Sequence, residues 1–274
     1  MTHHVTLTLT RFNEPDDLLE SVLAHLAAQR GVAGEILFIE QSTDSPLDAA
    51  RVANDRWSVR TIRKRLPGLS AARNLSLAEA AHDRVLFCDS DALADPGWAS
   101  AMNDAFDGPD VAVVGSRILP HWTRRPPILA ASRVVRDQLS LYDLGGDTIE
   151  VRRVVGAGFG VDRSLFASEM YFDEDLGRRD GKLFGGEESD LCARVRAAGG
   201  RVIYAGQARV DHVIQPERHS TRWILKRLYY AGLGRATVKG QPSPSRKPGL
   251  ADWLLLPVIL PPYALGWLRG RYGG

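Results

Sequence analysis

Two aspartates separated by one residue, Asp89 and Asp91, are the side chains in this sequence best suited to chemistry. They directly follow the apolar run 84–88, so they lie where a short buried strand is expected to end. Two carboxylates at a strand end can hold one divalent cation and leave its other positions to water and phosphate oxygens, which suits Mg²⁺ or Mn²⁺. The alternative is a helix cap or a solvated turn, and for an isolated Asp-x-Asp tripeptide that alternative is the commoner one.

Three other places along the chain carry reactive side chains. Glu187 and Glu188 precede a predicted helix; a carboxylate there can accept the proton of a hydroxyl, or simply complement the helix dipole. His212 could add an imidazole to the two aspartates, a ligand set that suits Mn²⁺, or it could be a hydrogen-bonded structural residue. Arg73 could stack on a base or pair with phosphate, and the alternative for it is an exposed position on a helix.

The elements that must position these residues alternate between strand and helix in the first half of the chain. Strands are predicted at 5–10, 35–39, 59–62 and 84–88, and helices at 16–30, from a start near 41–46, and at 70–81. Alternation of this kind favours an α/β fold with a parallel, doubly wound sheet. Ligands of such sheets bind at the carboxyl ends of the strands, so the polar residues that follow the first, second and fourth strands should converge on one crevice.

The second half of the chain has a less regular pattern. Strands are predicted at 111–115, 151–155 and 201–204, and helices at 189–198 and 222–235. We expect an α+β arrangement for this half. A Pro/Ser/basic segment at 241–247 then predicts a linker before the C-terminal tail.

Composition excludes several classes of protein. The 274 residues are 44% hydrophobic and 25% charged, which is typical of a globular protein with a sizeable core. The formal net charge of +2 gives no overall field for nucleic acid, so no nucleic-acid partner is expected. Cys88 and Cys192 match no metal-ligand spacing, and the polar N-terminus lacks the apolar region of a signal peptide. We therefore expect a cytoplasmic protein.

Several motifs occur in a definite order along residues 5–235. They are Phe12-Asn13-Glu14, Ser42-Thr43-Asp44, Arg73-Asn74, Asp89-Ser90-Asp91, Glu187-Glu188 and His212. Ordered motifs that agree are far more specific than any single match. The series resembles glycosyltransferase family 2, a large group of inverting enzymes with the GT-A fold. This implies an α/β protein with a doubly wound, mostly parallel central sheet flanked by helices, followed by a C-terminal helical, apolar tail.

The resemblance also implies which residues form the site. The residues expected to bind the nucleotide-sugar are Thr10, Asn13, Glu14, Glu40, Ser42, Asp44, Arg73, Asn74, Asp89 and Ser90. On the acceptor side we expect Gly158, Phe159, Gly185 and Gly186. Asp89, Asp91 and His212 are the expected metal ligands, for Mn²⁺ or Mg²⁺. Glu188, beside Glu187, is the expected catalytic base, although the family usually has Asp there. The family also usually has Asp and a small residue at Glu40 and Gln41, which leaves the identity of the nucleotide open.

The implied activity is transfer of a sugar from a nucleotide-diphosphate donor to an acceptor hydroxyl with inversion. The bound metal would neutralise the charge that develops on the diphosphate leaving group. Residues 1–115 would form the donor half, 116–235 the acceptor half of the same domain, and 236–274 the linker and tail. The acceptor would be a glycan or a lipid-linked molecule, in the synthesis of a cell-surface polysaccharide or glycolipid.

Three other functions fit the residues less well. The spacing Gly156-x-Gly158-x-Gly160 is not the dinucleotide-binding fingerprint and lies in mid-chain, which argues against a dehydrogenase. Asp89-x-Asp91 could open a haloacid-dehalogenase-like phosphatase, but Leu93 stands where that family has Thr or Val. A non-catalytic nucleotide-sugar-binding protein would not need Asp89, Asp91 and Glu188 intact.

The tail at 250–268 is strongly apolar. Pro257, Pro261 and Pro262 are expected to break any helix there, so a membrane-spanning helix is not expected. Its aromatic residues and the cations that come after it favour contact with a membrane surface, at the inner face of the cell membrane. The alternative is that this tail and the helix at 222–235 pack on the catalytic core or form a dimer contact.

Overall fold

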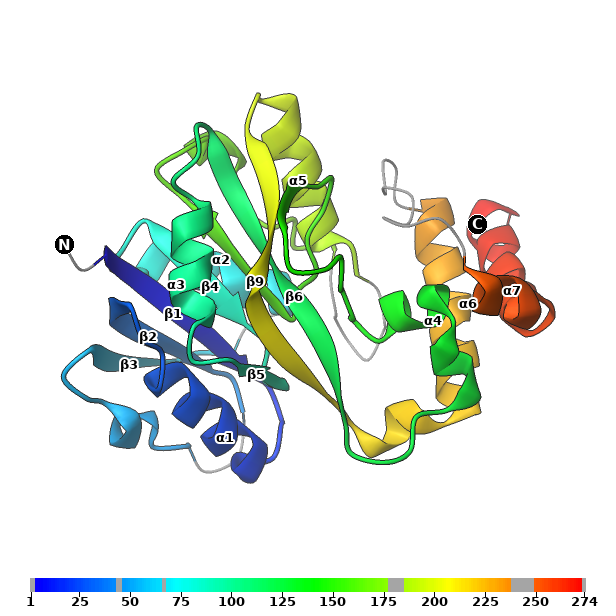
Figure 1. The fold of residues 1–274 in the computed structure, drawn as a ribbon, viewed down its shortest axis with the longest axis horizontal. Helices are drawn as coiled ribbons and strands as arrows, with labels where there is room; N and C mark the ends of the chain where they lie inside the picture. The colour runs from blue at the N-terminus through cyan, green and yellow to red at the C-terminus, as the bar shows by residue number, and fades with distance from the viewer. Residues whose placement is uncertain (1–2, 43–45, 66–67, 177–184, 238–248, 273–274) are drawn as a thin grey trace.

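The computed structural model describes residues 3–42, 46–65, 68–176, 185–237 and 249–272. A nine-stranded sheet forms the centre of the protein, with strand order β3-β2-β1-β4-β8-β6-β9-β5 and β7 paired to β9 (Figure 1). The strands are β1 (His3–Arg11), β2 (Val32–Glu40), β3 (Trp57–Arg63), β4 (Arg84–Cys88), β5 (Ala92–Ala94), β6 (Val111–Trp122), β7 (Thr148–Glu150), β8 (Gly158–Asp162) and β9 (Arg201–Ile214). Strands β1 to β4 pair in parallel, as the alternating pattern predicted.

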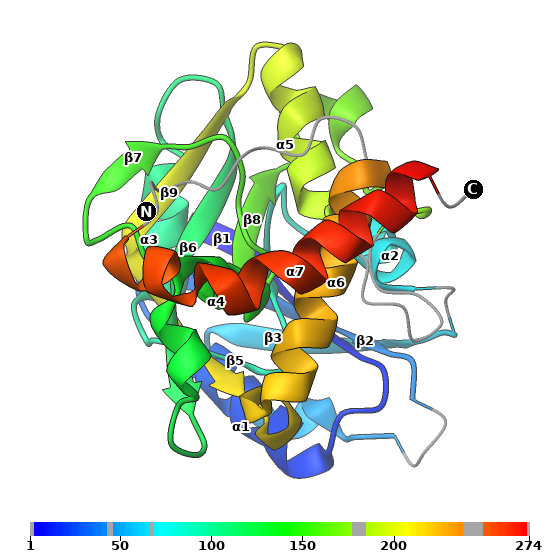
Figure 2. The same ribbon diagram turned by 90° about the vertical axis from the view of Figure 1, so that its right-hand side faces the viewer.

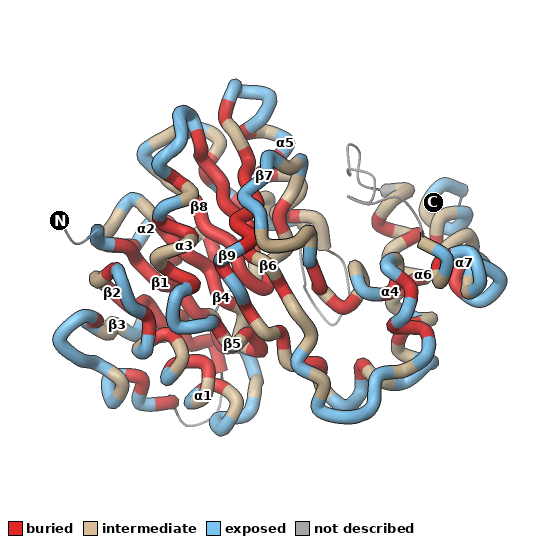
Figure 3. Tube along the Cα trace, in the orientation of Figure 1, coloured by how far each residue is buried: buried red, intermediate tan, exposed pale blue. Residues whose placement is uncertain are grey.

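Helices cover both faces of the parallel half. On one face, α1 (Asp16–Ala27) and α3 (Trp98–Ala105) pack over the odd-numbered apolar residues of β1, such as Leu7. On the other face, α2 (Leu69–Glu79) and α5 (Glu187–Ala197) pack over β2, β4 and β8. The buried residues therefore run through the sheet and the inner sides of these helices (Figure 3). This confirms the doubly wound arrangement.

The sheet continues into the second half with mixed strand directions. Strand β8 runs antiparallel between β4 and β6, while β6 and β9 pair in parallel. Strands β1 to β4, β6 and β9 thus all run in one direction, and β5, β7 and β8 run in the other. The sheet is mostly parallel, as the family resemblance implied.

Two predicted elements differ from the observed ones. Residues 151–155 form no strand: Val154 packs its side chain on Gly115 of β6, so this segment crosses the face of the sheet instead of joining its edge. After β2, the helix predicted to start near 41–46 is represented among the described residues by the short 3-10 helix η1 (Ala49–Val52). The mixed polarity of 41–55 provides no apolar stripe with which a longer helix could pack.

The chain ends in two long helices, α6 (Thr221–Thr237) and α7 (Leu250–Tyr272). The expectation that prolines break the tail was wrong, because α7 runs continuously through Pro257, Pro261 and Pro262. Pro257 and Pro261 are exposed, so their rings meet no neighbouring helix there. By length and composition, α7 could also cross a membrane. The elements beside α7 also include η2 (Ile128–Ala131) and α4 (Arg133–Gln138), while η4 (Pro216–His219) precedes α6 and η3 (Ala167–Glu169) precedes α5.

Candidate active site

Strand pairing brings Asp91 and His212 together. Strand β5 pairs antiparallel with β9 so that Ala92 lies opposite His212, and the Val213 amide donates to the Asp91 carbonyl at 2.8 Å. The Asp91 Oδ1 and His212 Nε2 atoms are 3.1 Å apart, and both side chains are buried. Two of the three predicted metal ligands, from strands far apart in the chain, therefore meet at one edge of the site.

A third residue, Arg218, completes this group, and no sequence motif pointed to it. Its guanidinium lies 3.0 Å from Asp91 Oδ2 and 3.3 Å from His212 Nε2. A single imidazole nitrogen cannot both donate to Asp91 and accept from Arg218. The His212 Nδ1 atom is buried, with no hydrogen-bond partner among the described residues. A cation at Nε2 would remove this conflict, so the oxygen and imidazole donors fit a Mn²⁺ or Mg²⁺ ion that takes its remaining ligands from phosphate and water.

The first aspartate of the pair is engaged elsewhere. Asp89 Oδ1 lies 3.2 Å from Arg73 Nη2. Among the described residues, no group of three His, Cys, Asp or Glu side chains is placed to hold a metal ion together.

Arg73 is the centre of a buried ion-pair cluster. Its Nη1 atom donates to Glu187 at 3.0 Å and to Glu188 at 2.9 Å, while Nη2 faces Asp89. The guanidinium also lies 5.2 Å from the centroid of the buried Phe159 ring. The arginine predicted to bind the nucleotide is therefore paired with three carboxylates, and it orients Glu188.

The cluster separates the two glutamates in pKa. Burial, together with the charge of Glu188, raises the pKa of Glu187 to about 7. Burial also disfavours the charged form of Glu188, but the charge and hydrogen bonds of Arg73 outweigh it, so the pKa of Glu188 lies below its usual value. Burial opposes the charge of Arg73 too, yet the three carboxylates raise the pKa of that guanidinium. Glu188 is thus ionised at neutral pH while Glu187 titrates near it.

Glycines shape the floor and the entrance of this cluster. A Cβ on Gly156 would overlap the Glu188 Oε1 atom and come within 2.8 Å of Arg73 Nη2, so a larger residue there would displace these two side chains. Gly186 precedes α5 with φ 119°, a left-handed conformation that glycine adopts readily. Gly158 serves packing instead, because a Cβ there would meet Val210 and Ser116. Gly185 and Gly186 lie directly before the two glutamates.

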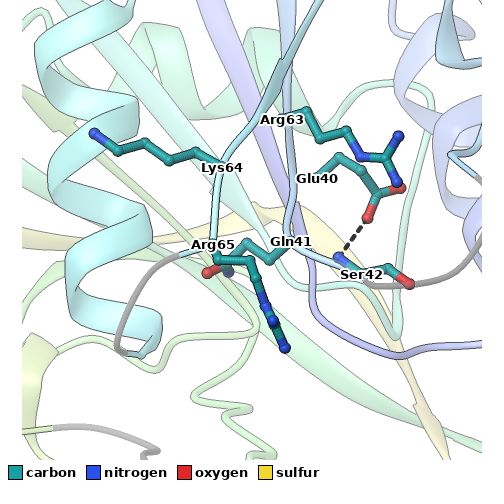
Figure 4. A pocket seen from close by; sticks show the side chains of 6 residues that line it. All are labelled: Glu40, Gln41, Ser42, Arg63, Lys64 and Arg65. Atoms are coloured by element: carbon teal, nitrogen blue, oxygen red, sulfur yellow. Dashed lines mark hydrogen bonds between the residues drawn. The ribbon is translucent and has the colours of Figure 1, made fainter.

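A pocket of about 320 Å³ lies at the ends of β2 and β3 (Figure 4). It is lined by Glu40, Gln41, Ser42, Arg63, Lys64 and Arg65. Glu40 is buried, and its carboxylate accepts from Arg11 at 3.1 Å and from the Ser42 amide at 2.8 Å. Gln41 is also buried, and its Oε1 atom has no hydrogen-bond partner among the described residues. Gln41 lines the pocket, so a shift of its side chain would offer this buried acceptor to a ligand.

Several predicted nucleotide-binding residues hold loops in place. Glu14 accepts from the amides of Phe12 and Asn13 at 2.7 and 3.2 Å, which closes the turn after β1. Asn74 exchanges two hydrogen bonds with the backbone of Phe172, at 2.9 and 2.7 Å. Thr10 and Ser90 lie half-buried at the ends of β1 and β4, and Asp44 lies outside the described residues.

Comparison with known proteins identifies the family of the chain. Residues 8–166, more than half of the chain, match the model of the family described as Glycosyl transferase family 2. Over 267 residues, the chain is 26% identical to the glucosyl-dolichyl phosphate glucuronosyltransferase of Haloferax volcanii, covering 93% of this chain and 82% of that protein. It is 30% identical over 165 residues to the pre-mycofactocin glycosyltransferase of Mycobacterium tuberculosis, covering 60% of this chain and 34% of that one.

Solved structures share the fold. The crystal structure of GalNAc-T7 with UDP, GalNAc and Mn²⁺ matches with a TM-score of 0.62 at 14% identity, over 85% of this chain and 50% of that one. The crystal structure of S. aureus TarS matches with a TM-score of 0.50 at 16% identity, over 87% of this chain and 41% of that one. The chain thus spans about half the length of these two proteins or less. It belongs to glycosyl transferase family 2 and has the GT-A fold of a glycosyltransferase.

Proposed function

We propose that this protein transfers a sugar from a uridine-diphosphate donor to a hydroxyl of a lipid-linked or surface-glycan acceptor, with inversion, on the cytoplasmic side of the membrane. The observation that carries the proposal is the Arg73 cluster, which holds an ionised Glu188 beside Asp89 at the ends of the sheet strands. One relative, the Haloferax enzyme, is named for a dolichyl phosphate substrate, which supports a lipid-linked acceptor. Residues 1–115 would bind the donor and 116–235 the acceptor, with 236–274 as linker and tail.

Glu188 is the proposed base. Its carboxylate takes the proton of the acceptor hydroxyl as the oxygen forms a bond to the anomeric carbon. The bond from that carbon to the diphosphate oxygen breaks on the opposite side, which inverts the configuration. Arg73 keeps Glu188 ionised and oriented, while Glu187, with its pKa of about 7, limits the negative charge in the cluster. A positioned base of this kind contributes about 10²- to 10⁴-fold to the rate.

Asp91 and His212 are the proposed metal ligands, with Asp89 as the third. When bound, a divalent cation there supplies positive charge to the diphosphate leaving group. Arg218, 3.0 Å from Asp91, holds that carboxylate in place. The Mn²⁺ in the GalNAc-T7 structure, which shares the fold, supports this assignment.

The base of the donor is proposed to be uracil. Its pairing edge presents a carbonyl, an N–H and a second carbonyl. A protein site that matches this edge must offer one hydrogen-bond acceptor between two donors. The pocket at the ends of β2 and β3 has that chemistry: Gln41 Oε1 is an acceptor with no partner among the described residues, and the other lining side chains include Arg65 and Lys64. The UDP in the GalNAc-T7 structure supports the same choice.

The direct test is a panel of UDP-, GDP-, CDP- and dTDP-sugars, scored for hydrolysis and thermal stabilisation with Mn²⁺ and with EDTA. We expect turnover of a UDP-sugar that EDTA abolishes. Asp91→Ala should abolish turnover and leave the melting temperature of the ligand-free protein within a few degrees. Turnover that persists in EDTA would contradict the proposed dependence on a metal. Preference for a GDP-sugar would contradict the proposal that the donor base is uracil.

A further inference from the structure

The outer face of α7 is apolar from Leu250 to Leu268. Asp252, Ile259 and Gly266 recur every seven residues and are buried against the rest of the protein. The exposed apolar side chains on the other sides of the helix are Leu250, Trp253, Leu254, Leu256, Val258, Leu260, Leu265 and Leu268. No charged residue occurs between Asp252 and Arg269. A helix of this length is about 35 Å long, so the exposed apolar strip exceeds what a surface in water usually carries.

The inner face of α7 is fixed to the body by small, specific contacts. A Cβ on Gly232 of α6 would overlap the carbonyl of Tyr263, and a Cβ on Gly266 would overlap the carbonyl of Tyr229. Glycines therefore let the two backbones touch, as helices often do within membranes. Asp252 also accepts hydrogen bonds from Ser132 Oγ at 2.6 Å and from the Arg133 amide at 2.8 Å. These contacts use few large apolar side chains, which leaves most of them on the outside.

The placement of α7 favours a helix that lies flat on a surface. It runs broadside across one end of the molecule, outside α6 and α4 (Figure 2). A flat surface that meets this end touches α7 along its length. If α7 crossed a membrane while packed on α6, the exposed cations Arg222 and Lys226 of α6 would have to enter the lipid, at high cost. An orientation in the plane of the interface avoids that cost.

The charge of the two helices indicates the chemistry of the surface. Together α6 and α7 contain six cations, Arg222, Lys226, Arg227, Arg235, Arg269 and Arg271, and one acid, the buried Asp252. A second copy of the chain would bring the same positive charge against itself, whereas an anionic bilayer complements it. Trp253, near one end of α7, and Trp267 and Tyr272, near the other, are aromatic residues of the kind that anchor at lipid headgroups.

We propose that α7 lies in the plane of an anionic bilayer, with its apolar outer face embedded below the headgroups and the catalytic body on the cytosolic side. This bilayer would be the surface that presents the acceptor, and only the identity of that acceptor rests on the proposed function. Helix α6 then separates the bilayer from the site: Arg227 lies 3.9 Å from where a Cβ on Gly185 would be, two residues before Glu187. The base would therefore be one helix away from the lipid surface.

The test is co-sedimentation of the whole protein, without any substrate, with two kinds of vesicle. One is pure phosphatidylcholine and the other contains about 30% phosphatidylglycerol. We expect binding to the anionic vesicles, weaker binding at high salt, and release by an alkaline carbonate wash. Leu254→Glu combined with Leu265→Glu should weaken binding at least about tenfold. Ile149→Glu is the matched control, because Ile149 is also an exposed apolar residue but lies on β7, and this variant should bind like wild type.

Each other outcome would overturn the proposal. If wild type does not bind anionic vesicles, or if the double variant binds them as well as wild type does, α7 does not bind a lipid surface. Retention after the carbonate wash indicates a spanning helix instead. A wild-type dimer in lipid-free solution that becomes monomeric in the double variant assigns the face to a second copy. A cooperative thermal melt close to that of wild type checks that both variants are folded, and since neither this check nor vesicle binding needs a donor or turnover, failure of the proposed function would be seen separately.

Discussion

At the scale of single residues, the site is organised by one guanidinium among three carboxylates. Arg73 contacts Asp89, Glu187 and Glu188. Removal of any one carboxylate therefore changes how strongly the guanidinium interacts with the other two. Two neighbouring acids whose surroundings separate their pKa values commonly divide acid and base roles. Here the separation leaves Glu188, the more exposed of the two, as the ionised group.

The raised pKa of Glu187 predicts how stability depends on pH. An unfolded glutamate loses its proton near pH 4.5, while the folded protein holds it until about pH 7, so the free energy of unfolding falls as pH rises through this window. Glu187→Gln removes the cost of ionising this buried group. We expect the variant to lose that slope and to be more stable than wild type at pH 8, by on the order of 2 kcal/mol.

Urea unfolding at pH 5.5 and pH 8 measures this difference. Asp190→Asn, which lies in the same first turn of α5 and is partly exposed, is the matched control and should keep the wild-type slope. A Glu187→Gln protein whose stability falls between the two pH values as steeply as that of wild type would show that Glu187 is not the titrating group.

Gln41 carries a second prediction at this scale. Its unpartnered Oε1 is the acceptor proposed for the N–H of uracil, which cytosine lacks. Gln41→Met keeps a similar volume without hydrogen bonds, so the preference for UDP over CDP should fall at least about tenfold, while binding of pyrophosphate is unchanged. Calorimetry with UDP, CDP and pyrophosphate measures this. An unchanged UDP-to-CDP ratio in the variant would assign base recognition to another residue.

At the scale of elements, the sequence predicted what local periodicity determines. The apolar runs of β1 to β4 and the helical spacing in α1 are local signals, and the polar residues after those strands do gather at one end of the sheet. Residues 151–155 looked like a strand because Val151, Val154 and Val155 are β-formers, but the close approach of Val154 to Gly115 is a tertiary contact with no local signal.

The same distinction applies to the site. Asp91, His212, Glu187 and Glu188 stand in ordered motifs, so the sequence predicts them as site residues. Arg218, which contacts Asp91 and His212, and the basic residues after β3 belong to no motif, because only the pairing of β5 with β9 and of β2 with β3 brings them to the site. The continuity of α7 through three prolines was missed because its packing on α6 outweighs the local preference.

Close backbone contact between α6 and α7 gives a prediction at the same scale. In Gly232→Ala, the added Cβ would meet the Tyr263 carbonyl, so the helices must separate. We expect faster hydrogen exchange in 250–272 and earlier proteolysis there. Gly234→Ala is the matched control, since a Cβ at Gly234 meets no atom within 4 Å, and it should behave like wild type or be slightly more stable. Equal exchange in both variants would contradict the close packing.

At the scale of the whole molecule, one sheet carries both halves of the proposed reaction. Strands β1 to β4 lead to the pocket and to Asp89, while β8, β6 and β9 bring Gly156, His212 and α5 to the same region from the second half. The two helices α6 and α7 cover one end of the molecule (Figure 2). The Arg73 cluster is where the halves meet, because it joins α2 to α5.

The most direct test of this account is the turnover number of Glu188→Gln with a UDP-sugar and its acceptor, measured beside the dissociation constant for UDP. The amide keeps the shape of the side chain but cannot accept the proton, so we predict that kcat falls at least about a hundredfold while UDP binding changes less than about threefold. Asp190→Asn, on the same helix, should retain wild-type values. Wild-type turnover in Glu188→Gln, or lost UDP binding with kcat maintained, would contradict the claim that Glu188 is the base.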